Sequence, residues 1–304
     1  MAGITTFVSQ TVLYATIYTL VALGIVIAGR TGIFNIFGEG ILLTAASAGF
    51  IVAHLTQSWL PGFVAGALVG GLFGLGYMVV HETYKINQFL LGVVFFILGT
   101  GLSDLIYKLV VGVTLVPPIA PPTPVVGEGT LKTLPILAGF LNQSVITYFM
   151  YAATAGSWWF LYKTKLGLET RAIGEDPKAA DIMGINVIRR RYLATIIGSA
   201  LIGVAGAFLA IVVIKTYSSG LAGGRGFMAI GIAIFASWRP QRVLLGGLLF
   251  AAVEVFSFTL QIAAKNVPYQ LFLMLPFLAV LVIMMIFHKK IEFPASVGKP
   301  YSRE

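Results

Sequence analysis

Residues 7–28 read FVSQTVLYATIYTLVALGIVIA. These 22 residues contain no charged side chain, and about 20 apolar residues are enough for one helical crossing of a bilayer. The stretch is too long for the apolar core of a signal peptide, and no basic region precedes it. We therefore expect a membrane span that is retained.

The chain as a whole has a similar composition. Of its 304 residues, 58% are hydrophobic and 10% are charged, and the mean hydropathy is +0.94. Soluble domains carry about 25% charged residues, so this composition indicates a protein that lies mostly in lipid. Cysteine is absent and the three histidines lie far apart. We expect neither a disulfide nor a metal site, and no cofactor bound by this chain.

Glycine is abundant, with 35 residues. Membrane helices approach each other closely where small residues face a neighbour. Tight helix packing is therefore predicted around five glycines of one apolar stretch: Gly66, Gly70, Gly71, Gly74 and Gly76.

Apolar stretches of spanning length recur along the sequence. The expected spans are 7–28, 35–55, 60–80, 88–110, 145–162, 192–214, 243–262 and 269–287, with a short, glycine-rich ninth at 226–238. At about 1.5 Å rise per residue, the ninth cannot cross a core of about 30 Å. It is predicted to be a half-helix continued by irregular backbone. The expected fold is an all-α polytopic bundle of about nine spans, forming one transmembrane domain over residues 1–304.

Nine crossings place the two termini on opposite sides of the membrane. If the C-terminus is cytoplasmic, fifteen of the 20 Lys and Arg residues lie on the cytoplasmic side and five outside, as the positive-inside rule requires. The N-terminus is then outside. Residues 111–144 form an external loop with six prolines, expected to be extended, and residues 163–191 form a cytoplasmic loop. The net charge of +9 follows from this distribution and needs no nucleic acid polymer as a partner.

The loop 163–191 contains signals for one short helix. Asp176 is a good N-cap, Pro177 suits the first helical position, and Gly184 suits the C-cap. Only about two turns fit between them, and a helix this short is not stable alone in water. It must dock, either on this chain's own face or on a partner, and the residues alone favour neither.

Four segments carry a resemblance to a known family. Lys178-Ala179-Ala180-x-x-x-Gly184 resembles the Glu-Ala-Ala-x-x-x-Gly loop signature of ATP-binding-cassette (ABC) importer permeases, with Lys in place of Glu. The wider run 167–185, together with 32–40, 223–230 and 238–240, resembles the permeases for simple sugars and nucleosides that work with a basic-membrane-protein type of binding lipoprotein. These are related to the branched-chain amino acid permeases. Asp176, where Asn is usual, and Pro276-Phe277, where Pro-Tyr is common, depart from the pattern.

The resemblance implies a type II-like importer permease in the cytoplasmic membrane of a prokaryote. It implies three partners besides lipid: a second related permease forming a heterodimer, a cytoplasmic ATPase that binds ATP and Mg, and an external binding lipoprotein. The implied solute is a nucleoside or related small polar molecule, with a simple sugar or riboflavin-like vitamin as the alternative. The loop residues implied to contact the ATPase are Glu175, Asp176, Pro177, Lys178, Ala179, Ala180, Asp181 and Gly184. If Ala180 sits at the centre of this contact, a bulky charge there should weaken docking.

Charged residues inside spans are expensive and usually paired or functional. Glu39 follows glycine-flanked, irregular sequence, and we favour a structural role for it. Asp104 is expected to pair with Lys108 at i+4. Arg225 could reach headgroups or close an external gate. Glu254 lies deepest, and we expect it to line the pathway or an inter-subunit contact. The candidate pathway residues are Asn35, Glu39, Phe227 and Glu254.

Two other classes of protein would leave different patterns in the sequence. A secondary transporter would carry ionisable relays in its spans and no docking helix, and an intramembrane enzyme would need a metal cluster or a nucleophile with a base. The sequence shows neither pattern. It also lacks the phosphate-binding Gly-x-x-x-x-Gly-Lys-Ser/Thr motif. The chain is therefore expected not to be an enzyme, and ATP is expected to be hydrolysed by another subunit.

Overall fold

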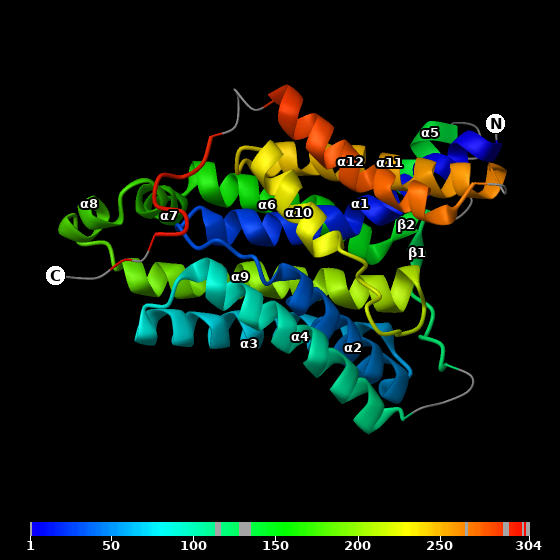
Figure 1. Cartoon of the computed structure of the whole chain (residues 1–304), viewed down its shortest axis with the longest axis horizontal. Coiled ribbons are helices and arrows are strands. Elements are labelled where there is room, and N and C mark those ends of the chain that lie inside the picture. Colours follow the sequence, from blue (N-terminus) through cyan, green and yellow to red (C-terminus); the bar gives the residue numbers. More distant parts are fainter. Residues whose placement is uncertain are drawn as a thin grey trace.

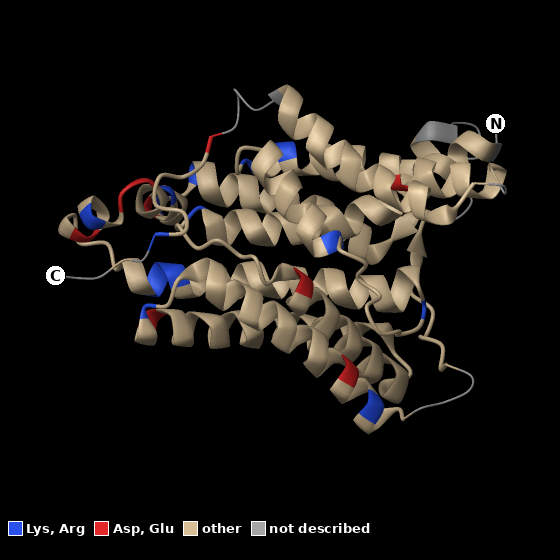
Figure 2. Ribbon diagram, in the orientation of Figure 1, with Lys and Arg blue, Asp and Glu red and all other residues tan. Residues whose placement is uncertain are grey.

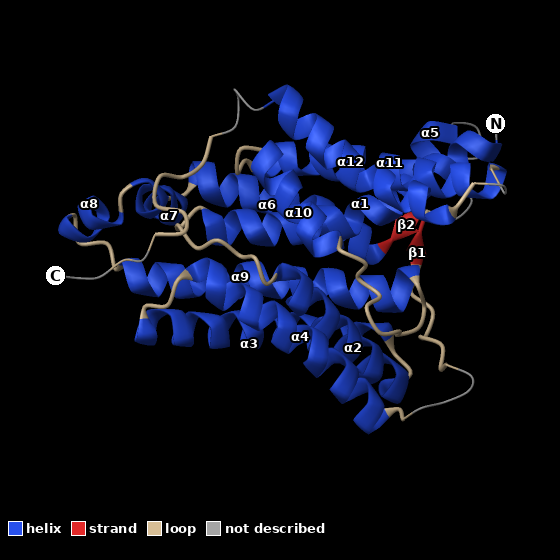
Figure 3. Cartoon of the chain, viewed as in Figure 1, coloured by secondary structure: helices blue, strands red, loops and turns tan. Residues whose placement is uncertain are grey.

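A computed structural model describes residues 2–112, 117–127, 135–264, 267–287, 292–299 and 301. Twelve α-helices occur among them, and the all-α class is confirmed apart from two short strands (Figure 3). The helices are α1 Ala2–Gly29, α2 Gly38–Thr56, α3 Trp59–Tyr84, α4 Gln88–Val110, α5 Pro135–Leu141, α6 Val145–Lys163, α7 Lys165–Glu175, α8 Pro177–Ile182, α9 Val187–Phe208, α10 Arg225–Phe235, α11 Pro240–Ala263 and α12 Tyr269–Phe287. A π-helical turn, Leu209–Val213, continues α9, and β1 Val125–Val126 pairs antiparallel with β2 Gln143–Ser144.

Seven helices of the described residues are long and apolar enough to cross a membrane. They are α1, α2, α3, α4, α9 with its π-helical turn, α11 and α12. The 19-residue α6 and the 11-residue α10 are not among them. The helical membrane bundle is therefore confirmed, whereas the total of nine crossings stays a prediction.

Helix α1 is the centre of the bundle (Figure 1). It packs against α6, α9, α10 and α11, and 89% of its most apolar window is buried inside the protein. A helix that is apolar on all sides can be buried on all sides. Polar side chains in the middle of α1, such as Thr16 and Tyr18, are therefore enclosed by protein.

Helices α3 and α9 approach each other through glycine. A Cβ atom added to Gly66 would lie 2.9 Å from the carbonyl oxygen of Gly203, and one added to Gly74 would lie 2.6 Å from Cβ of Ser199. Gly70 faces α9 in the same way, whereas Gly71 and Gly76 have ordinary contact distances. The predicted tight packing is thus confirmed for three of the five glycines, because only those three face a neighbouring backbone closely.

The two ends of the molecule differ. Helices α7 and α8 and the C-terminus lie at one end, and the N-terminus, α5, β1 and β2 lie at the other (Figure 1). Several Lys and Arg residues gather at the α7 and α8 end (Figure 2). The structure thus separates the loop 163–191 from the loop 111–144, of which residues 113–116 and 128–134 lie outside the described part. Which end faces the cytoplasm remains a prediction from the charges.

The loop 163–191 contains two helices where one was expected. The additional helix is α7, which begins where the Thr164 hydroxyl accepts a hydrogen bond from the Gly167 N–H group at 3.0 Å. Thr170 and Ile173 are buried on one side of it. The spacing of these residues was a helical signal that the sequence analysis missed.

Candidate functional site

Helix α10 begins inside the bundle, after the irregular segment 214–224 (Figure 1). Gly223 and Gly224 precede it with φ angles of +58° and +83°, a left-handed conformation that favours glycine. Eleven residues make a helix of about 16 Å, shorter than a bilayer core. The predicted half-helix is therefore present, and its first N–H groups need acceptors from elsewhere.

Glu39 of α2 supplies those acceptors. Its Oε1 accepts from the Gly224 N–H group at 2.8 Å and its Oε2 from the Gly226 N–H group at 2.6 Å. Glu39 is 5% exposed. A Cβ atom on Gly226 would lie 2.6 Å from the Glu39 backbone, so glycine is required for this approach. The geometry is that of a helix cap contributed by another helix.

Arg225 and Glu254 form a buried ion pair beside this cap. Arg225 Nε and Nη2 donate to Oε1 of Glu254 at 3.1 and 2.6 Å, and the Tyr18 hydroxyl donates to Oε2 at 2.8 Å. The two charged side chains are 13% and 6% exposed. The pair joins α1, α10 and α11 at the start of the half-helix.

Arg225 also orders the segment before α10. Its Nη1 donates to the carbonyl oxygens of Leu221 and Ala222 at 3.3 and 3.1 Å, and the guanidinium lies 5.6 Å from the centre of the Tyr14 ring. The sequence suggested that Arg225 reaches lipid headgroups or closes an external gate. It did not predict this arrangement, because the pairing partner, Glu254, lies on another helix. Arg225 is held inside the bundle by Glu254.

Asp104 of α4 holds the same segment from the other side. Its carboxylate accepts hydrogen bonds from the Tyr217 hydroxyl at 2.8 Å and from the Ser219 hydroxyl at 2.5 Å. The expected pair with Lys108 is not among the ion pairs of the described residues. A pocket of about 230 Å³ surrounds these groups.

Three of the four candidate pathway residues meet at the start of α10. Glu39 and Glu254 bind it, and Phe227 lies in its first turn, 39% exposed and edge-to-face with Phe96 at 5.1 Å. Asn35 is fully buried before α2, and neither polar atom of its side chain finds a hydrogen-bond partner within the described part of the chain. The structure therefore does not join Asn35 to the other three.

The local signals for the loop helix are confirmed in α8. Oδ1 of Asp176 accepts from the N–H groups of Lys178 and Ala179 at 3.0 and 3.1 Å. Pro177 occupies the first turn, and Gly184 has a φ of +84° just beyond the end. Glu175, Asp176, Lys178, Ala179 and Gly184 are exposed, and Pro177 and Asp181 are half-buried.

Ala180, a possible centre of the partner contact, faces its own chain. Ala180 is 4% exposed and packs with Ile173, Val187 and Tyr301 of this chain. The exposed apolar residues are Ile182, at 86%, and Met183, at 80%. Part of α8 therefore docks on its own chain, and the far side is open.

The C-terminal segment connects this helix pair to the membrane core. The Ser296 N–H group donates to the carbonyl oxygen of Gly174 at 2.9 Å, and the Gly298 N–H group donates to that of Gly32 at 3.2 Å. Tyr301 lies under the guanidinium of the fully buried Arg191 at 5.7 Å. The segment thereby joins α7 and α8 to the turn that leads into α2.

Comparison with known proteins identifies the family. The model described as "branched-chain amino acid transport system / permease component" matches residues 7–286. The chain belongs to this family. Among similar proteins, the putative glucose ABC transporter permease protein TsgC13 of Haloferax volcanii is 36% identical over 81% of this chain and 75% of its own length. The guanosine ABC transporter permease protein NupQ of Bacillus subtilis is 29% identical over 97% and 95%. The nucleoside ABC transporter permease protein NupC of Lactococcus lactis is 27% identical over 97% and 96%. No solved structure matches the chain.

The chain is thus a multi-pass permease of a prokaryotic membrane, as the resemblance implied. Sequence reasoning missed two parts of its site. One is Tyr18, whose hydroxyl donates a hydrogen bond to the Glu254 carboxylate, and the other is the set of contacts between the C-terminal segment and α7. A tyrosine in the middle of an apolar span was the available signal for the first, because a buried hydroxyl needs a partner. Among the described residues, no group of three or more His, Asp or Glu side chains is placed to hold a metal ion.

Proposed function

We propose that this permease translocates a nucleoside or a related small polar solute into the cytoplasm. Energy comes from ATP and Mg on a separate ATPase subunit. Two of the relatives above are named as permeases for nucleosides or guanosine, and each matches 97% of the chain. The structural observation that carries the proposal is the half-helix α10, whose start is held inside the membrane domain by Glu39 and by the Arg225–Glu254 pair.

Irregular backbone at membrane depth is tolerated only beside protein or a water-filled cavity. In segment 214–224, the residues Ser218, Ser219 and Gly220 are exposed in the isolated chain. Helix α10 packs against α12, and its Phe227 contacts Phe96 of α4. The most apolar windows of α4 and α12 are only 28% and 6% buried. This face therefore supports a pathway lined by Phe227 and closed by a second, related permease, in a heterodimer.

Helix α8 is the proposed contact with the ATPase. The apolar residues Ile182, at the end of α8, and Met183, directly after it, point away from the chain. Exposed apolar anchors fit recognition of a short helix in a partner's groove. We therefore assign the central contact with the ATPase to Ile182 and Met183 and not to the buried Ala180. Ala180 keeps the helix seated on Ile173 and Val187.

The remaining parts of the proposal concern orientation and the outer partner. The α8 end is cytoplasmic and the N-terminus is outside, because fifteen of the 20 Lys and Arg residues then lie inside. A binding lipoprotein delivers the solute to the opposite end, where α5 and the loop 111–144 lie.

A competition uptake assay tests which solute the permease carries. Cells expressing the importer take up a labelled nucleoside, and unlabelled nucleosides, ribose, glucose or riboflavin are added in excess. The proposal expects nucleosides to suppress uptake and the other three compounds not to do so. The putative glucose permease among the relatives makes a sugar the second candidate. If cells take up labelled glucose in a way that depends on this chain and take up no nucleoside, the substrate is a sugar and not a nucleoside.

A further inference from the structure

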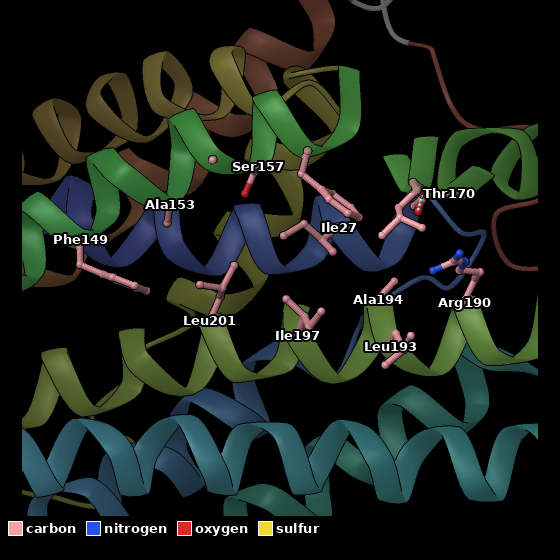
Figure 4. A pocket seen from close by; sticks show the side chains of 13 residues that line it. Ile27, Phe149, Ala153, Ser157, Thr170, Arg190, Leu193, Ala194, Ile197 and Leu201 are labelled. Atoms are coloured by element: carbon pink, nitrogen blue, oxygen red, sulfur yellow. Dashed lines mark hydrogen bonds between the residues drawn. The ribbon is translucent and has the colours of Figure 1, made fainter. Parts of the chain in front are cut away.

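A groove runs along the membrane domain between α6 and α9. Both helices pack on α1, and the space left between them has a volume of about 430 Å³. Figure 4 shows Phe149 of α6 and Leu201 and Ile197 of α9 along the groove, with Ile27 of α1 at its floor. Its lining is almost entirely apolar over the part that lies within the spans.

One end of the groove is polar. Arg190 of α9 and Thr170 of α7 line it there (Figure 4). Trp158 and Trp159, close to the same end of α6, are 39% and 59% exposed. Tryptophan side chains of this kind collect at the membrane–water interface. The tryptophans therefore place the Arg190 end of the groove at the level of the lipid headgroups.

Positive charge exceeds negative charge around this end. Lys163 lies over the Trp158 ring at 5.8 Å, Lys165 begins α7, and Arg189 adjoins Arg190. Glu169 pairs with Arg190 at 2.5 Å, with the two side chains 30% and 26% exposed. A partly exposed pair of this kind is weak, so the guanidinium can exchange its partner for another anion.

We propose that the groove binds an anionic phospholipid, with one acyl chain between α6 and α9 and the phosphate at Arg190. Basic pockets between membrane helices on the cytoplasmic side are suited to anionic headgroups, and the apolar walls suit the chain. The bound lipid fills the space between α6 and α9 and packs against Leu166 and Thr170 of α7, the helix that precedes α8.

A helix of another subunit is the competing occupant. The irregular backbone that requires protein cover lies elsewhere, beside α4, α10 and α12, and no residue of those three helices lines the groove. The cation at the end of an apolar groove also matches a lipid better than it matches an apolar helix.

Photo-crosslinking in reconstituted liposomes tests the proposal with the full chain in its assembly. The probes are phosphatidylglycerol and phosphatidylcholine, each carrying a diazirine in one acyl chain, and mass spectrometry maps the adducts. Adducts near Leu68 and Leu72 of α3, which are 62% and 65% exposed, report ordinary lipid contact and serve as the reference for correct insertion. We expect groove adducts from phosphatidylglycerol to exceed those from phosphatidylcholine by at least fivefold after this normalisation.

Gly156 offers a sharp variant, because a Cβ atom there would meet nothing within 4 Å. Gly156→Leu fills the groove and is expected to remove most groove adducts while the α3 adducts remain. Gly101→Leu, at an equally open glycine of α4, is the matched control and should change nothing. Arg190→Gln should reduce phosphatidylglycerol labelling to the level of phosphatidylcholine. Equal labelling by both lipids, groove labelling unaffected by Gly156→Leu, or α3 adducts without groove adducts from either lipid would overturn the proposal.

Discussion

Arg225 and Glu254, 29 positions apart, form a two-donor ion pair in which Nε and Nη2 lie 3.1 and 2.6 Å from one carboxylate oxygen. Tyr18 binds the other oxygen at 2.8 Å. A buried charge is costly unless it is paired and hydrogen-bonded. Each charge of this pair therefore depends on the other for its place inside the membrane domain.

The first prediction removes one of the two charges. Glu254→Gln leaves Arg225 without its anion, and breaking a buried pair costs about 3–5 kcal/mol. We expect both membrane abundance and nucleoside uptake to fall, measured by immunoblot and by transport in vesicles. The double variant Arg225→Met with Glu254→Gln should restore abundance without restoring uptake. Normal abundance of the single variant would show that the pair contributes little.

A second prediction concerns the cap on α10. Gly226→Ala places a methyl group against Glu39, and overpacking of this kind costs about 1–3 kcal/mol. The melting temperature of the purified permease should fall and uptake should decrease. Gly101→Ala, in open space on α4, is the control for an added methyl group in a helix. Equal melting temperatures for the two variants would mean that α2 moves away from the added methyl group without loss of stability.

The third prediction separates the two sides of α8. Ile182→Ala with Met183→Ala should weaken co-purification of the ATPase while the permease itself stays stable. Loss of an interface anchor costs more than about 1 kcal/mol, so affinity should fall at least fivefold per residue. Ala180→Arg should instead lower the melting temperature of the permease, because it forces a long cation among Ile173, Val187 and Tyr301. Ile119→Ala, at an apolar residue that is 72% exposed at the other end, is the control. An ATPase retained in full by the double variant would remove α8 from the interface.

The fourth prediction fixes the orientation. The chain has no cysteine, so Met183→Cys and Ile119→Cys each introduce a single thiol, at positions 80% and 72% exposed. A membrane-impermeant thiol reagent added to intact cells should label position 119 only, and both positions should label after permeabilisation. Labelling of position 183 in intact cells would reverse the topology.

Seven of the nine expected spans match helices that are long and apolar enough to cross a membrane. They could be predicted from sequence because lipid requires long uninterrupted apolar helices. Helix α8 could be predicted because its signals, Asp176, Pro177 and Gly184, are local. The direction in which Ala180 faces could not, since it depends on Tyr301, which is 121 positions away in the chain.

In the candidate site, too, local sequence predicts some features, whereas others depend on residues that are distant in the chain. The sequence identified Glu39, Arg225 and Glu254 as charges inside spans, because such residues are rare there. It could not pair Arg225 with Glu254 or place Glu39 on the N–H groups of α10, because those contacts depend on how α2, α10 and α11 pack. The sequence predicts an ion pair between Asp104 and Lys108, four positions away, but the hydrogen-bond partners of Asp104 are Tyr217 and Ser219.

In the proposed pathway, the cap on α10 has a consequence for which solutes pass. A helix N-terminus normally attracts phosphate, because its free N–H groups and dipole favour an anion. Here both oxygens of Glu39 already occupy that end, and the nearby guanidinium of Arg225 is already matched by Glu254. A phosphorylated solute would meet no vacant donor at this point, and the unpaired negative charge of Glu39 would repel it. The arrangement favours an uncharged nucleoside over the corresponding nucleotide.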